Sequence, residues 1–481
     1  MIMHKLKIYS FFALLCFLMA VEGCKIPKIA TVQENKTVPA AFNNNNADST
    51  INMAAMQWRS FFTDPNLISL IDTALKNNQE LNITLQEIEI AKNEILARKG
   101  AILPNAAIRA GAGFEKVGRY TSQGAGDAST DIKPGKEVPE ILPDYMLGLY
   151  GSWEADIWKK LRNAKKAAVT RYLSTVEGRN FVLTNLIGEI ANSYYELVAL
   201  DNQLEIVRQT IALQKNALEI VKIQKEATRA TELAVQKFEA EVRGSQSLEY
   251  DILQKITEAE NTINLLLGRY PQDIPRDKSN FLGLLPQAVN SGIPSQLLAN
   301  RPDVKQAELD LTAAKIDVQV ARAEFYPTVD ISAAIGLQAF NPGYLVKLPA
   351  SMLYSLAGEL VAPLINRSAI KAEFYSANAR QLQALFNYQR TVLNAYLEVV
   401  NQLSKINNLG KSYELKTQQV NALTKSIDIS NDLFKSARAD YLEVLMTQRD
   451  ALEARLDLID TKKDQLNAVI NVYRDLGGGW K

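Results

Sequence analysis

The sequence AILPNAAIRAGAG at 101–113 returns in altered form as EFYPTVDISAAIG at 324–336, and this repetition decides the fold. Each stretch passes through a proline and continues in small and apolar residues. A second run containing glycine follows each of them, GLYGSWEADIW at 148–158 and SLAGELVAPLI at 355–365. Internal repetition sets the unit of architecture, so it constrains every later prediction.

The spacing within each half supports a true duplication. Each half carries a long periodic segment and ends at a leucine-glycine break, at Gly268 and Gly477. Trp153 lies 115 residues before Gly268, and Pro363 lies 114 residues before Gly477. The unit is about 210 residues long and is used twice, which predicts one structure with two similar halves.

The chain divides into five segments, two of which are the structural repeats. We predict a signal peptide at 1–23, a polar lipidated tether at 24–57, a first structural repeat at 58–270, an equatorial linker at 271–300 and a second repeat at 301–481.

Composition excludes several classes of function. The chain has 54 basic and 53 acidic residues, so its overall charge attracts neither nucleic acid nor anionic lipid. The single histidine, His4, precedes the predicted cleavage point, which excludes histidine-based catalysis or metal binding in the mature chain. We predict no cofactor and no metal site.

The N-terminus has the pattern of a targeting segment. Lys5 and Lys7 precede an apolar run at 8–21 that is too short to span a bilayer and is followed by Gly23 and Cys24. One interpretation is a secretory signal that is cleaved nearby. We favour a lipoprotein signal that is cleaved before Cys24, whose thiol then receives the lipid.

Each half contains two segments that predict the strands of one β-hairpin. The first hairpin lies at about 104–153 and the second at about 327–363. Small and apolar residues alternate with a two-residue period in runs of about 10 residues, which suits tilted strands between lipid and water. Gly, Asp, Ser and Pro between 118 and 143 indicate a long exposed loop. From these strands alone, ordinary soluble hairpins are an equal alternative.

The rest of the chain predicts long helices. Asp64 and Pro65 are suited to start a first helix over about 66–100. No proline occurs between 144 and 270 or between 364 and 481, so each block predicts two antiparallel helices of about 50 residues each. The helices should turn back at 226–232 and 435–440, where small and charged residues gather.

Four strands cannot close a barrel, and open strand edges are not tolerated in lipid. The chain therefore has to borrow strands from copies of itself. Three copies would supply twelve strands, which lies within the range of bacterial barrels. Their six helical hairpins would be enough to wall a tube, so the sequence predicts a conduit.

The segment IPSQLLANRPDVKQAELDLTAAKIDVQVARAEFYPTVDISAAIG at 293–336 resembles the signature of TolC-type outer-membrane efflux channels, in the lipoprotein branch that serves RND-type pumps. The resemblance continues in order at 58–81, 152–164, 191–204, 439–452 and 473–480. It implies a mainly α fold with a membrane β part: a homotrimer whose twelve-stranded β-barrel continues into a long α-helical barrel. It also implies passive export of drugs, metals or other solutes across the outer membrane of a Gram-negative bacterium, with a periplasmic adaptor and an inner-membrane RND pump as partners.

The resemblance directs attention to the periplasmic ends of the helical hairpins, which such channels often close with rings of aspartate. At the usual acidic positions this chain has Ala234, Glu443 and Met446. A carboxylate ring binds cations, and here Glu443 keeps that character. The other candidate residues of this tip site are Arg229, Glu232, Arg438 and Asp440.

The two arginines could pair with these acids and tie neighbouring hairpins together. Ordinary solvated turn charges are the alternative, because surface ion pairs are individually weak. The glycine common after the strand-to-helix junction in this family is also missing, with Lys159 and Ser368 in its place.

Other functions remain open at this point. The outer channel of a type I protein secretion system shares the implied fold. A structural coiled-coil lipoprotein without a pore is a second alternative, which the aromatic-flanked strands disfavour. An enzyme is disfavoured because the sequence shows no nucleophile motif, metal cluster or phosphate loop.

Overall fold

The computed structural model describes residues 37–42, 52–278, 281–284, 289–363, 367–436 and 438–480. One compact unit contains Ile90–Tyr172 and Leu309–Leu385, and the other contains the described residues of Glu34–Glu89, Leu173–Glu308 and Phe386–Lys481. Each unit therefore combines segments from both halves of the sequence. The predicted signal peptide and Cys24 lie outside the described residues.

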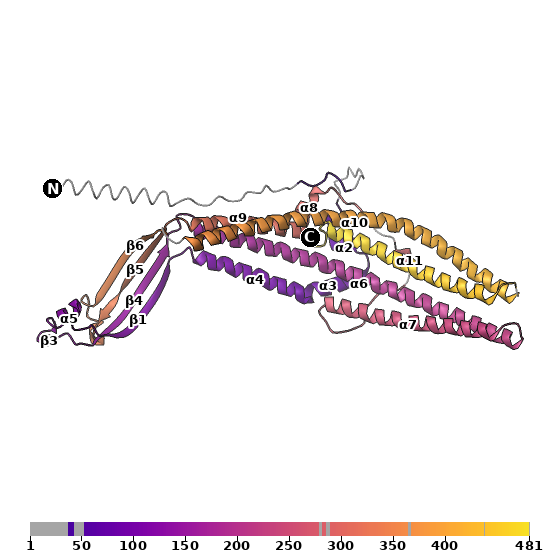
Figure 1. Cartoon of the computed structure of the whole chain (residues 1–481), viewed down its shortest axis with the longest axis horizontal. Coiled ribbons are helices and arrows are strands. Elements are labelled where there is room, and N and C mark those ends of the chain that lie inside the picture. Colours follow the sequence, from indigo (N-terminus) through magenta and orange to yellow (C-terminus); the bar gives the residue numbers. More distant parts are fainter. Residues whose placement is uncertain are drawn as a thin grey trace. The chain divides into compact units, whose positions relative to one another are not determined.

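The first unit contains a four-stranded antiparallel sheet. Its strands are β1 (Asn105–Glu115), β4 (Leu142–Glu154), β5 (Thr328–Ala339) and β6 (Met352–Val361), in the order β1-β4-β5-β6. Both predicted hairpins are confirmed (Figure 1). They also join each other, because β4 pairs with β5 from Tyr145↔Ala339 to Glu154↔Asp330. Strands β1 and β6 form the two edges of this sheet.

The two faces of the sheet differ in polarity because successive side chains of a strand point to opposite sides. In the observed register one face collects apolar side chains: Ile108, Phe114, Leu147, Leu149, Ile335, Leu337, Tyr354, Leu356 and Leu360. The opposite face collects mostly polar or small ones: Arg109, Tyr150, Ser152, Asp330, Ser332, Gln338, Ser355 and Glu359. The apolar face is not a core, since Ile108 is 77% exposed and Leu356 is 80% exposed.

The segment between β1 and β4, predicted as a long exposed loop, contains elements of its own. They are the short helix α5 (Ser122–Asp127) and a small hairpin of β2 (Asp131–Lys133) and β3 (Lys136–Glu137). The Lys133 ammonium lies 5.0 Å from the ring centre of Tyr344, in the η3 turn (Pro342–Tyr344) between β5 and β6. This cation–π contact ties the two loops together.

Helices make up most of the second unit and part of the first. Besides the short segments η1 (Met53–Ala55), α2 (Trp58–Phe61), η2 (Phe281–Gly283) and α8 (Ser295–Asn300), they are α3 (Pro65–Asn77), α4 (Gln79–Gly100), α6 (Lys160–Glu226), α7 (Glu232–Leu266), α9 (Pro302–Ala323), α10 (Ser368–Lys435) and α11 (Tyr441–Asp475). No helix among the described residues has the length and apolar character needed to cross a membrane.

The prediction of one helix over 66–100 is wrong, because the chain breaks at Asn78. Asp64 does start the first helix, and its carboxylate accepts the Asn66 amide at 2.8 Å. Asn78 then adopts extended backbone angles and ends α3. Its side-chain oxygen accepts the Leu81 amide at 2.9 Å and thereby caps the start of α4.

The two helical hairpins turn where the sequence predicts, but their arms are unequal. Helix α6 has 67 residues and its partner α7 has 35, while α10 has 68 and α11 has 35. Apolar residues at three- and four-residue spacing form one buried face of α6: Leu183, Leu186, Ile187, Ile190, Tyr194, Leu197 and Val198. Each long helix begins a few residues after a strand, whereas each short arm ends at a glycine turn, at Gly268 or Gly477.

The junction from β4 to α6 bends without glycine. Lys159 adopts a left-handed conformation with φ 61°, which is uncommon for a residue with a side chain. The Asp156 carboxylate accepts the Leu161 amide at 3.0 Å and the Arg162 amide at 2.9 Å, so it caps the start of α6. These contacts stabilise the bend where the resemblance predicts a glycine.

Candidate functional site

The turn from α6 to α7 positions the first group of candidate residues. Thr228 ends α6 in a left-handed conformation with φ 59°, and the Arg229 amide donates to the Gln224 carbonyl at 2.8 Å. This bond closes the helix in the manner of a Schellman motif. The Thr231 hydroxyl accepts the Ala234 amide at 3.3 Å and starts α7.

Glu232 forms its ion pair across this turn with Lys225 and not with Arg229. It also accepts the Gln236 side-chain amide at 2.8 Å. The Lys225 ammonium and then the Gln236 amide hold the pKa of the Glu232 carboxyl below its usual value. Within one chain the cation that pairs with Glu232 is thus Lys225, in the last turn of α6, and a pairing of Arg229 with the acids of a neighbouring hairpin stays a prediction.

The turn from α10 to α11 repeats the main-chain bond that Arg229 makes to Gln224. The Arg438 amide donates to the Leu433 carbonyl at 2.8 Å, and Asp440 precedes α11 as its N-cap. The Glu443 amide donates to the Asp440 carbonyl at 3.1 Å. All three charged side chains, Arg438, Asp440 and Glu443, are exposed. Glu443 lies in the first turn of α11, where a carboxylate interacts favourably with the helix dipole.

An apolar cluster holds the two turns together. Its buried members are Ala217, Leu218, Val221, Ala234, Val235, Phe238, Val242, Val444 and Leu445. The cluster thus joins α6 and α7 of one hairpin to α11 of the other. Ala234, at a position where the family usually has aspartate, is completely buried in it. In the single chain this residue packs and is not available to an ion.

Met446 belongs to a neighbouring surface groove. A pocket of about 400 Å³ lies between α7 and α11. It is lined by Gln236, Lys237, Ala240, Glu241, Leu442, Leu445, Met446 and Arg449. Met446 is 46% exposed there. The candidate residues therefore lie in three different surroundings. The charged ones are at the turns, Ala234 is buried in the apolar cluster, and Met446 lines the groove.

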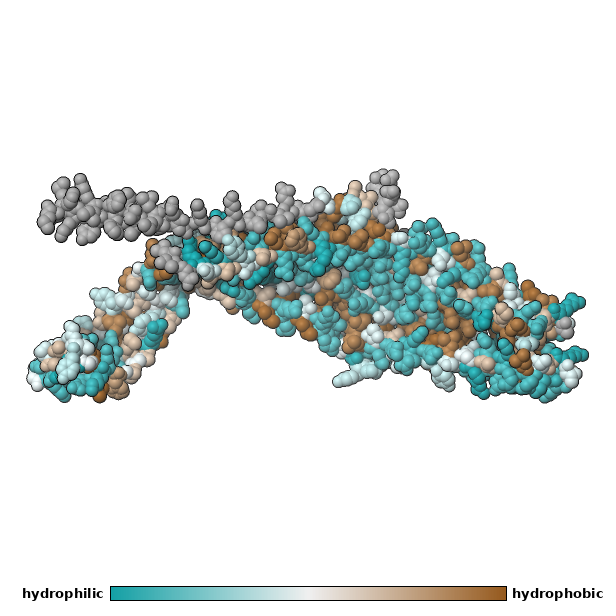
Figure 2. Space-filling view, viewed as in Figure 1, coloured by the Kyte–Doolittle hydropathy of each residue, from teal (hydrophilic) through white to brown (hydrophobic). Residues whose placement is uncertain are grey.

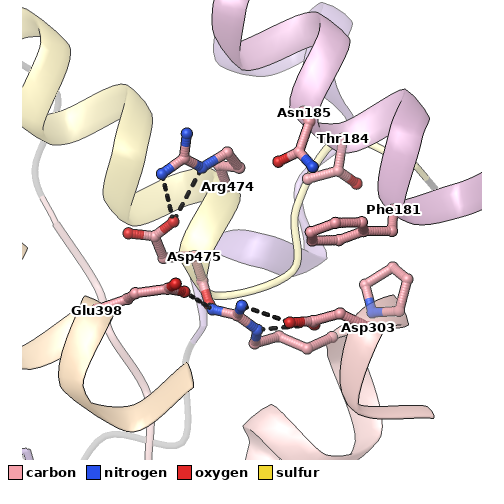
Figure 3. Close-up of a pocket in the computed structure, with 9 residues that line it drawn as sticks. Phe181, Thr184, Asn185, Asp303, Glu398, Arg474 and Asp475 are labelled. Carbon is pink, nitrogen blue, oxygen red and sulfur yellow. Dashed lines mark hydrogen bonds and ion pairs between the residues drawn. The ribbon is translucent and has the colours of Figure 1, made fainter. Parts of the chain in front are cut away.

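A second polar cluster, which the sequence analysis did not single out, surrounds Arg301 between α8 and α9. Its guanidinium binds the Asp303 carboxylate in bidentate fashion at 3.0 and 2.7 Å, and donates to Glu398 at 2.7 Å. It also donates to the Asp475 carbonyl at 2.8 Å. Figure 3 shows dashed lines from this guanidinium to the carboxylates of Asp303 and Glu398. Burial lowers the pKa of Arg301, but the carboxylates of Asp303 and Glu398 outweigh it and raise the pKa above its usual value.

The Asp475 side chain lies beside this arginine in the same pocket of about 220 Å³. One of its oxygens accepts the Arg474 guanidinium at 2.9 Å, whereas the buried Oδ2 has no hydrogen-bond partner among the residues that the structure describes. Burial raises the pKa of this carboxyl, and Arg474 opposes the shift only in part. The sequence could not reveal this cluster, because Arg301 is 97 positions from Glu398 and 174 from Asp475.

The exposed strands provide a third functional surface. Figure 2 shows hydrophobic and intermediate residues along the strands and hydrophilic residues at the loops that join them. This distribution matches a sheet that faces lipid between two polar regions. Among the described residues, no group of three or more histidine, cysteine or acidic side chains is arranged to hold a metal ion.

A four-stranded sheet with an exposed apolar face and two duplicated helical hairpins defines a TolC-type channel subunit. A crystal structure of CusC covers 94% of this chain and 99% of its own, with a TM-score of 0.81 and 23% identity. The model of the outer membrane efflux protein family matches residues 70–269 and 293–478.

Named relatives show the same similarity over nearly their whole length. The pyoverdine export outer membrane protein OpmQ of Pseudomonas aeruginosa is 29% identical over 88% of each chain. The cation efflux system protein CusC of Escherichia coli is 25% identical over 97% of this chain and 98% of its own. The chain belongs to the outer membrane efflux protein family. It is an outer-membrane channel protein of an efflux system, in a family of channels and not of enzymes.

Proposed function

We propose that three copies of this chain together form the outer-membrane duct of a tripartite RND-type efflux system, with a wall that has no open strand edge. The observation that carries the proposal is the sheet, which exposes an apolar face and has β1 and β6 as its edges. In lipid each edge needs a partner strand. Pairing β6 of one copy with β1 of the next closes a barrel of twelve strands around the polar face.

The proposed duct is passive and does no catalysis. The helical hairpins would extend it into the periplasm, where a periplasmic adaptor and an inner-membrane RND pump supply the driving force. OpmQ and CusC are named for pyoverdine and for cations. These two cargos have little in common, which supports a duct that passes small solutes, drugs or metals as the pump delivers them.

Lipid anchoring is a separate part of the proposal. We infer that the chain is cleaved before Cys24 and that the thiol is acylated, which would fix the N-terminus to the outer membrane. Cys24→Ser should abolish incorporation of a radiolabelled fatty acid while the protein still reaches the outer membrane. Labelling that persists in this variant would refute the anchor.

Conductance of the purified protein in a planar bilayer tests the duct. We expect a particle of three chains by mass measurement and single-channel currents that increase with an added adaptor. A stable monomer without currents would support the structural coiled-coil alternative. Currents from a protein that works together with an exporting ATPase, and not with an RND pump, would support the protein-secretion channel.

A further inference from the structure

A contact inside the chain suggests how one subunit meets the next. In the first unit, Asp317 of α9 forms an ion pair with Arg171 of α6. Nearby, the rings of Tyr326 and Trp158 stack with their centres 4.6 Å apart. These contacts join α9, from the second half of the sequence, to α6, from the first half.

The duplication assigns an equivalent to each partner. Helices α4 and α9 have 22 residues each, and a shift of 223 positions superimposes their ends and the following prolines, Pro104 and Pro327. Helices α6 and α10 end at Glu226 and Lys435, which are 209 positions apart. The same 209 positions separate Gly268 from Gly477.

These shifts place Glu94 at the position of Asp317 and Arg380 at the position of Arg171. The signs of both charges are therefore conserved between the halves. Within the chain, however, Glu94 pairs with Arg98 on its own helix at 2.7 Å, and Arg380 pairs with Glu373 on its own helix at 3.1 Å. Glu94 is 49% exposed and Arg380 is 65% exposed.

Apolar residues on α4 and just after it show the same pattern. Ile90 is 68% exposed, while its equivalent on α9, Ala313, is 2% exposed. Leu103 is 58% exposed, and its equivalent Tyr326 stacks on Trp158. Ile90 and Glu94, four residues apart on α4, therefore expose an apolar and an acidic side chain, whereas their equivalents on α9 are a buried alanine and an aspartate that is paired with α6.

We propose that Glu94 of one subunit forms an ion pair with Arg380 of the neighbouring subunit, so that α4 packs against α10 across the subunit boundary. The occupant of this α4 face is a second copy of the chain, because α10 carries the matching arginine at the repeat-equivalent position. The inference rests on the proposed trimer and specifies the register of its helices.

Charge reversal in the purified full-length protein tests the pair. Glu94→Arg and Arg380→Glu should each lower the temperature at which the trimer dissociates, because each places like charges across the boundary. The double variant should recover most of the loss. Equal and additive losses in the double variant would overturn the pairing.

Cross-linking gives a second readout that does not depend on stability. The variant Glu94→Cys/Arg380→Cys, treated with a short bismaleimide, should give covalent dimers and trimers on denaturing gels. The matched control Arg171→Cys/Asp317→Cys should cross-link only within a chain. Intact trimers without cross-linked subunits would refute this inference alone, whereas an unmodified protein that forms no trimer would refute the proposed function.

Discussion

Arg301 and Asn78 make the same main-chain contact in the two halves of the protein. The Arg301 guanidinium donates to the Asp475 carbonyl at 2.8 Å, and the Asn78 side-chain amide donates to the Leu266 carbonyl at 2.9 Å. Both residues follow a helix end and precede a 22-residue helix. Each therefore joins the start of that helix to the end of a shorter hairpin arm.

The two contacts differ in charge, and this difference affects their neighbours. Arg301 neutralises Asp303 and Glu398, whose equivalents beside Asn78 are Glu80 and Glu189. Burial, and then the Glu80 carboxylate, raise the pKa of Glu189, while Arg474 opposes the shift. The first half therefore keeps two interacting carboxylates where the second half has a neutralised cluster.

Removal of the buried arginine should be costly. We expect Arg301→Leu to destabilise the protein by about 3 kcal/mol, because Asp303 would lose its partner in a site with little access to water. Arg208→Leu, which removes the 2.8 Å ion pair of a half-exposed arginine with Glu249, should cost less than about 1 kcal/mol. Thermal unfolding followed by circular dichroism measures both. Equal shifts in melting temperature would contradict a structural role for Arg301.

The glycines that end the two halves should tolerate no side chain. Gly268 and Gly477 have φ of 66° and 89°, and an added Cβ would lie 2.4 Å from the Asn77 carbonyl oxygen and 2.6 Å from that of Asn300. Each Gly→Ala change should therefore cost more than about 1 kcal/mol. Gly410→Ala, inside α10 with no atom within 4 Å, should instead stabilise the helix by about 0.5–1 kcal/mol. A stable Gly268→Ala variant would show that the turn can relax.

The sequence predicted the repeated architecture because the signals were local or periodic. Two-residue alternation predicted the strands, and the absence of proline from 144–270 and from 364–481 predicted the helices of the two hairpins. The break at Asn78 was missed, since apolar spacing continues through it and the deciding bonds come from its own side chain and from Leu266. Lys225 was missed as the partner of Glu232 for a related reason: a turn's geometry selects among several nearby cations.

Asp475 predicts a pH dependence of stability. Burial raises its pKa above the ordinary value of 3.8. The folded state therefore binds this proton more tightly, and the resulting stabilisation is complete below pH 3.8 and is lost as the pH rises through the folded-state pKa. Asp475→Asn should remove this loss, so its melting temperature should fall less than that of the wild type between pH 4 and 7. Asp428→Asn, at an exposed position of α10, should leave the wild-type slope unchanged.

The exposed carboxylate in the first turn of α11 should influence permeation. In the proposed trimer three copies of Glu443 would form an acidic ring, which attracts cations and repels anions. Glu443→Gln should reduce the cation preference measured as a reversal potential in a salt gradient, with no change in trimer mass. Glu453→Gln, exposed further along the same helix, provides the control. An unchanged reversal potential would remove Glu443 from the permeation path.

Ala234 tests whether the first hairpin can carry the acid that relatives of this type often have. Its side chain is completely buried with Phe238 and Val444, so Ala234→Asp would place a carboxylate in an apolar cluster. We expect a loss of at least about 2 kcal/mol and faster proteolysis at the α6–α7 turn. Leu233→Asp introduces the same group one residue earlier, at a position that is 59% exposed, and should be tolerated. If Ala234→Asp instead left the melting temperature unchanged and raised cation selectivity, the side chain would have to face the duct in the assembled protein, and the packing seen in the single chain would not describe the functional tip.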